Sequence, residues 1–143
     1  YCSKLCSYAQ GMAQLRAASK AHGWALPLAE LAKIWRGGGI IRAHVLSLVH
    51  AAFERQPELP NLLLDPEIAK EVASRADLWR SLVALAVQYG VPVPALSSSL
   101  AYYDTMRTDT LHSAQCVQAQ RDFFGSHGFE RLDRDGTYHA SWL

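Results

Sequence analysis

The sequence predicts an all-α protein, and three observations support this fold class. Apolar residues recur every three or four positions along most of the chain, which is the spacing of one face of a helix. Glycines and prolines divide these segments into lengths typical of helices. No segment sustains the alternation of apolar and polar residues that marks a half-buried strand.

The first part of the chain is predicted to form three helices. The first covers about residues 1–21, and Gly23 ends it because glycine readily adopts the left-handed conformation past a helix. A second helix over 28–36 follows Pro27, a residue favoured at the first helical position. A third, apolar helix over about 40–55 comes after three consecutive glycines. The apolar stripe of the first helix consists of Leu5, Tyr8, Met12 and Leu15.

The next helix has the clearest start signal in the chain. After a proline-containing loop over 56–64, Asp65 is an N-cap candidate, and a proline and an acidic residue follow it. We expect this helix to continue to Tyr89, with Gly90 closing it. Its predicted inward residues are Ile68, Val72, Trp79, Leu82, Val83 and Ala86.

Two further helices are expected over 95–106 and 113–124, and the second stops at Gly125. Residues 126–143 have no helical period but are rich in apolar side chains, whereas free termini are usually polar. This tail is therefore expected to lie in a groove, either on its own domain or on a partner chain. We predict one domain over 1–143, with a helical core over 1–125 and an extended tail. The large apolar residues of the tail are Phe129, Leu132, Tyr138 and Trp142.

Composition excludes several classes of protein. The chain has 143 residues, 50% of them hydrophobic and 19% charged, as in a folded globular domain. A net charge of +1 with interspersed signs argues against nucleic-acid binding. No apolar run is long enough to cross a membrane, and no secretion signal opens the chain. We expect a cytoplasmic protein with reduced cysteines. Because it begins at Tyr1 and not at Met, we expect a part of a longer protein.

Two candidate sites have a structural explanation that fits better. The three glycines at 37–39 suggest a phosphate-binding loop, but the fingerprint of a dinucleotide site needs another glycine where Arg42 stands. A tight turn between helices explains them more simply. His44 and His50 are six residues apart and lie on different faces of a helix, so no metal site is expected.

The segment around the last helix contains a more specific pair of residues. Arg121 lies on that helix, and His127 lies just beyond its end. An arginine offers a planar fork of donors for a phosphate or carboxylate, and a histidine adds a donor that can be charged near neutral pH. The alternative is a surface arginine paired with Asp122 or another acid, together with an ordinary loop histidine.

Several motifs, in order along nearly the whole chain, resemble the C-terminal domain of decarboxylating 6-phosphogluconate dehydrogenases. They are Ser7-Tyr8-Ala9-Gln10-Gly11, Ile34-Trp35-Arg36-Gly37-Gly38, Ile40-Ile41-Arg42-Ala43, Asn61-Leu62-Leu63-Leu64-Asp65-Pro66, Gly90-Val91-Pro92-Val93-Pro94, Ala101-Tyr102-Tyr103-Asp104 and the 118–125 run. The chain departs from the family pattern over 111–116, at Gly39 and at Gly128-Phe129.

The resemblance implies an enzyme that oxidises 6-phospho-D-gluconate with NADP and releases CO₂, giving ribulose 5-phosphate. It also implies a homodimer in which the tail of one subunit reaches the active site of the other. The family's substrate-binding arginine and histidine then correspond to Arg121 and His127. The NADP-binding loop and the catalytic lysine and glutamate belong to upstream sequence, so the chain alone is expected to be inactive.

Two other functions stay open at this point. A non-enzymatic helical interaction module could retain the same fold, and the sequence upstream of Tyr1 would distinguish it from an enzyme. Another dehydrogenase of the wider β-hydroxyacid group is the weaker alternative, because those relatives have shorter C-terminal domains without this tail.

Overall fold

A computed structural model describes residues 1–37 and 45–142 of the chain. It confirms the all-α class and adds one short β-hairpin in the tail. The described residues divide into two compact units, Tyr1–Asp104 and Thr105–Leu143. The elements are α1 (Cys2–His22), α2 (Leu28–Gly37), α3 (Val45–Arg55), the 3₁₀ turn η1 (Leu62–Leu64), α4 (Pro66–Ala73), α5 (Ala76–Gln88), α6 (Pro94–Met106), α7 (His112–Gly125), β1 (Phe129–Glu130) and β2 (Thr137–Tyr138).

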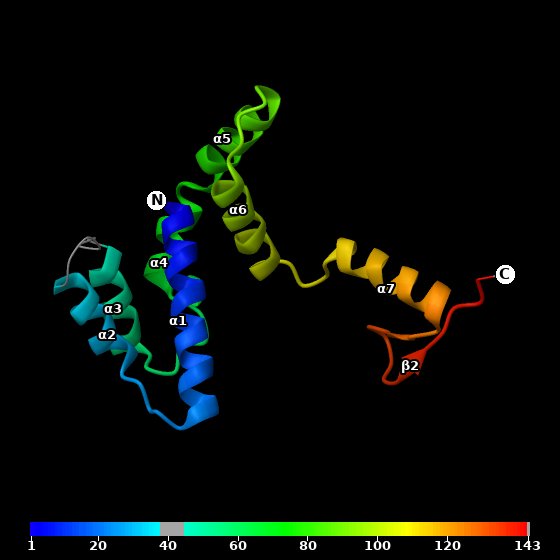
Figure 1. Cartoon of the computed structure of the whole chain (residues 1–143), viewed down its shortest axis with the longest axis horizontal. Helices are drawn as coiled ribbons and strands as arrows, with labels where there is room; N and C mark the ends of the chain where they lie inside the picture. The colour runs from blue at the N-terminus through cyan, green and yellow to red at the C-terminus, as the bar shows by residue number, and fades with distance from the viewer. Residues whose placement is uncertain (38–44, 143) are drawn as a thin grey trace. The chain divides into compact units, whose positions relative to one another are not determined.

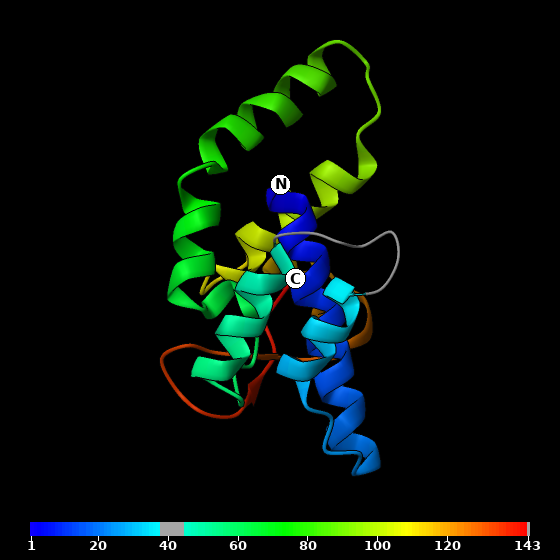
Figure 2. The same ribbon diagram turned by 90° about the vertical axis from the view of Figure 1, so that its left-hand side faces the viewer.

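The first three predicted helices are present with nearly the predicted bounds. Gly23 ends α1 in the left-handed conformation, with φ 66°, as expected. Helices α2 and α3 lie side by side in both ribbon views (Figure 1, Figure 2). The predicted start of the third helix at residues 40–44, the three-glycine turn beyond Gly37, and His44 lie outside the described residues.

The core of the first unit is one continuous apolar cluster. One face of α1 is buried in this cluster, and η1 and α4 pack against α1. Helix α3 packs on α4. Burial of this apolar surface is the main stabilising contribution to the unit. Its largest fully buried side chains are Leu5, Met12, Leu46, Leu62, Ile68, Val49, Val72 and Cys6.

Asp65 begins α4 as predicted. Its Oδ1 accepts the backbone N–H groups of Glu67 and Ile68, each at 3.1 Å. Its Oδ2 accepts from Arg55 at 2.6 Å, so the buried carboxylate is satisfied on both oxygens. Asn61 caps η1 in a similar way, accepting from the N–H of Leu63.

The prediction of a single helix from 66 to 89 is wrong, since the chain forms α4 and α5 with a break at Ser74–Arg75. The Ser74 hydroxyl donates to the carbonyl oxygen of Glu71, and the Arg75 N–H donates to Val72. A side-chain bond of this type competes with helical pairing. No glycine or proline marks the break, so periodicity alone could not find it. Leu82, predicted to be buried, is 50% exposed.

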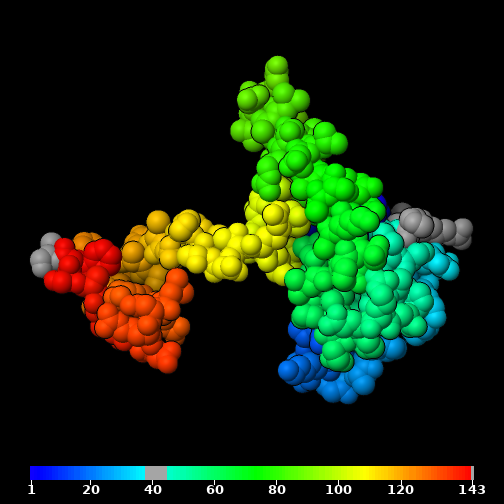
Figure 3. All heavy atoms as spheres, turned by 180° about the vertical axis from the view of Figure 1, so that it is seen from behind, coloured from blue at the N-terminus to red at the C-terminus, as the bar shows by residue number. Residues whose placement is uncertain are grey.

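Helices α5 and α6 are joined by a bidentate ion pair. Arg80 donates to both carboxylate oxygens of Asp104, at 2.7 and 2.6 Å. The rings of Trp79 and Tyr103 pack at a centroid separation of 6.1 Å. In the space-filling view the far end of α5 projects from the packed helices of the first unit (Figure 3).

The second unit groups α7 with the tail, whereas the sequence suggested a division after Gly125. Over residues 1–37 and 45–142, no helix has the length and apolar composition needed to span a membrane.

Candidate functional site

Helix α7 runs through Gly125, and Ser126 is the residue in the left-handed conformation, with φ 48°. Gly125 is therefore the last residue of the helix, whereas the sequence predicted that the helix would stop there, and it does not adopt the left-handed conformation. Its role is to leave space, because a Cβ at this position would lie 2.6 Å from Nε2 of His127. The His127 ring lies against the end of the helix and packs edge-on to Phe124, with 6.0 Å between ring centroids.

The tail folds back as a short antiparallel hairpin, which the sequence did not predict. Phe129 pairs with Tyr138 and Glu130 with Thr137. Gly128, just before the hairpin, has φ 74°, and a Cβ there would lie 2.5 Å from Cγ2 of Thr137. Only glycine fits this backbone conformation and this close approach.

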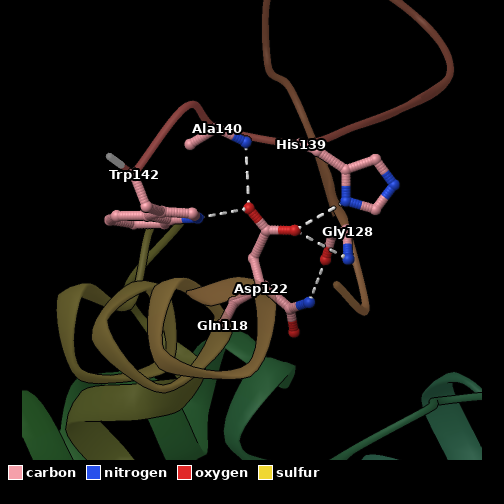
Figure 4. Close-up of polar contacts among 6 residues, drawn as sticks. All are labelled: Gln118, Asp122, Gly128, His139, Ala140 and Trp142. Carbon is pink, nitrogen blue, oxygen red and sulfur yellow. Dashed lines mark hydrogen bonds and ion pairs between the residues drawn. The ribbon is translucent and has the colours of Figure 1, made fainter. Parts of the chain in front are cut away.

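The Asp122 carboxylate holds the tail against α7. Its Oδ1 accepts from the Gly128 N–H at 3.1 Å and from Nδ1 of His139 at 2.8 Å. Its Oδ2 accepts from the Ala140 N–H at 2.9 Å and from Nε1 of Trp142 at 2.8 Å. Figure 4 shows these four donors converging on the two oxygens. Since a carboxylate only accepts, Nδ1 of His139 carries the proton.

These hydrogen bonds explain the acidity of Asp122. The Ala140 N–H contributes most, followed by the side chains of Trp142 and His139 and then the Gly128 N–H, while burial acts in the opposite direction. Together they lower the pKa of Asp122 from 3.8 to about 2. Asp122 is 2% exposed, and the tail supplies all four of the donors that its carboxylate binds.

Gln118 lies one turn before Asp122 and makes two further contacts. Its Nε2 donates to the carbonyl oxygen of Gly128, and its Oε1 accepts from Nη1 of Arg121 at 3.1 Å. Asp122 and Gln118 thus bind the N–H and the C=O of the same glycine (Figure 4).

The structure brings the two predicted site residues together. Arg121 and His127 line one open cavity of about 410 Å³, and both side chains are exposed. The cavity wall is completed by Gln118, Gly128, Phe129, Glu130 and Thr137. The alternative pairing of Arg121 with Asp122 is not observed, because the Asp122 carboxylate is occupied by the tail. Within the described ranges, no carboxylate forms an ion pair with Arg121.

Such a cavity is suited to an anion. The guanidinium presents several N–H donors in one plane, and an imidazole can add a further donor. The part of the chain that the structure describes contains no group of three His, Cys, Asp or Glu side chains that could hold a metal ion. Contact of Arg121 and His127 with a substrate stays a prediction.

Sequence reasoning missed the residues that organise this cavity. Gln118 and Asp122 are four residues apart on a helix, so their shared face was predictable. Nothing in the local pattern indicated that the tail returns to that face, and Asp122 was considered only as a partner for Arg121. His139 and Trp142 carried no signal beyond the apolar character of the tail.

Comparison with known proteins identifies the family. The family model described as "6-phosphogluconate dehydrogenase, C-terminal domain" matches residues 1–142. The chain is 53% identical over 142 residues to "6-phosphogluconate dehydrogenase, decarboxylating 2, chloroplastic" of Oryza sativa subsp. japonica, covering 99% of this chain and 28% of that protein. It is 51% identical to "6-phosphogluconate dehydrogenase, decarboxylating" of Synechococcus elongatus, covering 100% of this chain and 30% of the relative.

A solved structure has the same fold. It is the Plasmodium falciparum 6-phosphogluconate dehydrogenase, whose description includes the apo form and complexes with NADP+ and with 6-phosphogluconate. The TM-score is 0.91 at 42% identity, covering 99% of this chain and 30% of that one. The chain thus spans about 30% of the length of the relatives it matches. From these matches and the helical fold, the chain belongs to the 6-phosphogluconate dehydrogenase family and corresponds to its C-terminal domain.

Proposed function

We propose that this chain is the substrate-closing and dimerising domain of a decarboxylating 6-phosphogluconate dehydrogenase, in which Arg121 and His127 bind the phosphate of 6-phospho-D-gluconate. The observation that carries the proposal is the shared cavity. It places both side chains on one surface and leaves the Arg121 guanidinium without an acidic partner among the described residues. The relatives named above support the choice of substrate.

In this proposal the chain contributes to binding and orientation. Arg121 offers paired donors to the phosphate oxygens, and His127 offers one more. Fixing the phosphate end places the distant C3 hydroxyl against the nicotinamide of NADP, which lowers the entropic part of the barrier. NADP binding, proton transfer at C3 and loss of CO₂ require residues from the rest of a full-length enzyme, which gives ribulose 5-phosphate as product.

The exposed apolar side chains of the second unit support a partner subunit. Phe124 is 70% exposed and Leu132 is 90% exposed, and Phe123, Val117 and Trp142 are also largely accessible. This many large exposed apolar side chains on a unit of this size are typical of a protein that contacts a partner. A second copy of the chain is the occupant we propose, with the cavity facing the partner's active site.

Substitution of Arg121 tests the proposal in the full-length enzyme. For Arg121→Ala we expect the KM for 6-phosphogluconate to rise by about one to two orders of magnitude, because one or two charge-assisted hydrogen bonds are lost. The KM for NADP should change little. Arg134→Ala is the matched control, since Arg134 is an exposed arginine of the same compact unit and does not line the cavity. An unchanged KM for 6-phosphogluconate in Arg121→Ala would refute the assignment.

A further inference from the structure

Two side chains on α7 hold the peptide groups next to His127. Asp122 accepts the N–H of Gly128, and Gln118 donates to the C=O of the same residue. His127 precedes Gly128 directly in the chain, so these two bonds fix the direction in which the backbone leaves His127.

Gln118 also contacts Arg121, the other predicted site residue that lines the cavity. The nitrogen atoms of Arg121 can only donate, and the carbonyl oxygen of Gly128 can only accept. One orientation of the Gln118 amide satisfies both, with Oε1 toward Arg121 and Nε2 toward Gly128. A single rigid amide therefore links the guanidinium of Arg121 to the backbone beside His127.

The neutral amide is well suited to this task. A glutamate at position 118 would also accept from Arg121, but its negative charge would neutralise the guanidinium and repel an incoming phosphate. It would also lose the donor that Gly128 requires. Glutamine holds Arg121 in place while leaving its positive charge available to a ligand.

We propose that Gln118 is a positioning residue of the substrate site, which holds Arg121 and the His127 segment in one fixed relation so that both bind the same phosphate group. This rests on the proposed function. Gln118 acts through Arg121 and Gly128, and the loss of its amide leaves both phosphate-binding side chains present but no longer coupled.

The test uses the full-length enzyme and the substitution Gln118→Met, which keeps an unbranched side chain of similar length and good helix propensity. We expect the KM for 6-phosphogluconate to rise about two- to tenfold, the effect of one or two ordinary hydrogen bonds, with the KM for NADP unchanged. The matched control is Gln120→Met, because Gln120 is exposed on the same helix and does not line the cavity. Gln118→Leu serves as the second variant if Gln118→Met fails to fold.

A double-mutant cycle separates positioning from general structural damage. In the Arg121→Ala background, Gln118→Met should raise the KM for 6-phosphogluconate by less than in the wild-type background, because Arg121, one of the two groups that Gln118 holds in a fixed relation, is gone. A rise as large as in wild type would overturn the proposal, as would a Gln118→Met KM equal to that of wild type. If Arg121→Ala itself leaves the KM unchanged, the proposed function fails. If only Arg121→Ala raises the KM, the role of Gln118 alone is refuted.

Discussion

Replacing Asp122 with asparagine should release the tail from α7. The carboxylate accepts four hydrogen bonds, two on each oxygen. An asparagine amide has one accepting oxygen, so with His139 in its present tautomer two of the four bonds are lost in either orientation, and the new NH₂ group faces two N–H donors. The substitution changes the side-chain volume very little, which makes the loss of hydrogen bonds the dominant effect.

The size of the effect follows from the number of bonds lost. Each hydrogen bond to a charged group is worth about a factor of ten or more in an equilibrium constant, so two lost bonds predict a roughly hundredfold weaker tail contact. The backbone amides of Gly128 and Ala140 report on it directly, because both donate to Asp122. Their hydrogen-exchange protection factors, measured by NMR on the 143-residue chain, should fall by about two orders of magnitude.

The matched control is Asp135→Asn, which makes the same change of charge at an exposed residue within the tail itself. Protection at Gly128 and Ala140 should stay at the wild-type value in this variant. If protection in Asp122→Asn stays within about threefold of wild type, the carboxylate does not hold the tail, and the reasoning above is wrong.

The lowered pKa of Asp122 predicts a pH dependence for the same amides. The pKa is 3.8 for a free carboxyl and about 2 with the tail bound. A depressed pKa means that the stabilisation is present above pH 3.8 and is lost as pH falls through about 2. Protection factors at Gly128 and Ala140 should therefore decrease between about pH 4 and pH 2 in wild type. The protection factors of Asp122→Asn should not depend on pH in this range. If they fall as much as in wild type, the titrating group is not Asp122.

Three further substitutions test the fold and the cavity. Leu46→Ala should destabilise the first unit by about 2–5 kcal/mol in urea unfolding, because Leu46 is fully buried, while Leu78→Ala at an exposed position should change little. Asp65→Ala should cost about 1–2 kcal/mol by the same assay through loss of the α4 cap, and no change would refute the capping role. Gly125→Ala should displace the His127 ring and raise the KM for 6-phosphogluconate without lowering the thermal midpoint; a wild-type KM would show that the ring adapts.

Local patterns predicted most of the helices. The Asp65-Pro66-Glu67 start, the αL glycine at position 23 and the apolar stripe of α1 were each confirmed. These features depend on residues within a few positions of one another, so they can be recognised without the fold.

The errors arose where no local signal exists. The break between α4 and α5 at Ser74 and Arg75 has no glycine or proline, and it depends on side-chain and backbone hydrogen bonds that periodicity does not encode. Leu82 belongs to the apolar stripe of the predicted single helix but is half-exposed in the structure. The stripe was extended from α4 into α5, and the break between these two helices makes that extension invalid.

At the candidate site, too, the sequence predicted some features and only the tertiary structure revealed others. Arg121 and His127 could be singled out because their side-chain chemistry suits an anion, and because the motifs around them resemble one enzyme family. The sequence by itself also determined that the tail is too apolar to be free. Only the tertiary structure decided that the tail returns to α7. There the Asp122 carboxylate accepts hydrogen bonds from Gly128, His139, Ala140 and Trp142. The reason is physical: these donors lie up to 20 residues from their acceptor, and contacts between distant residues depend on how the chain folds back.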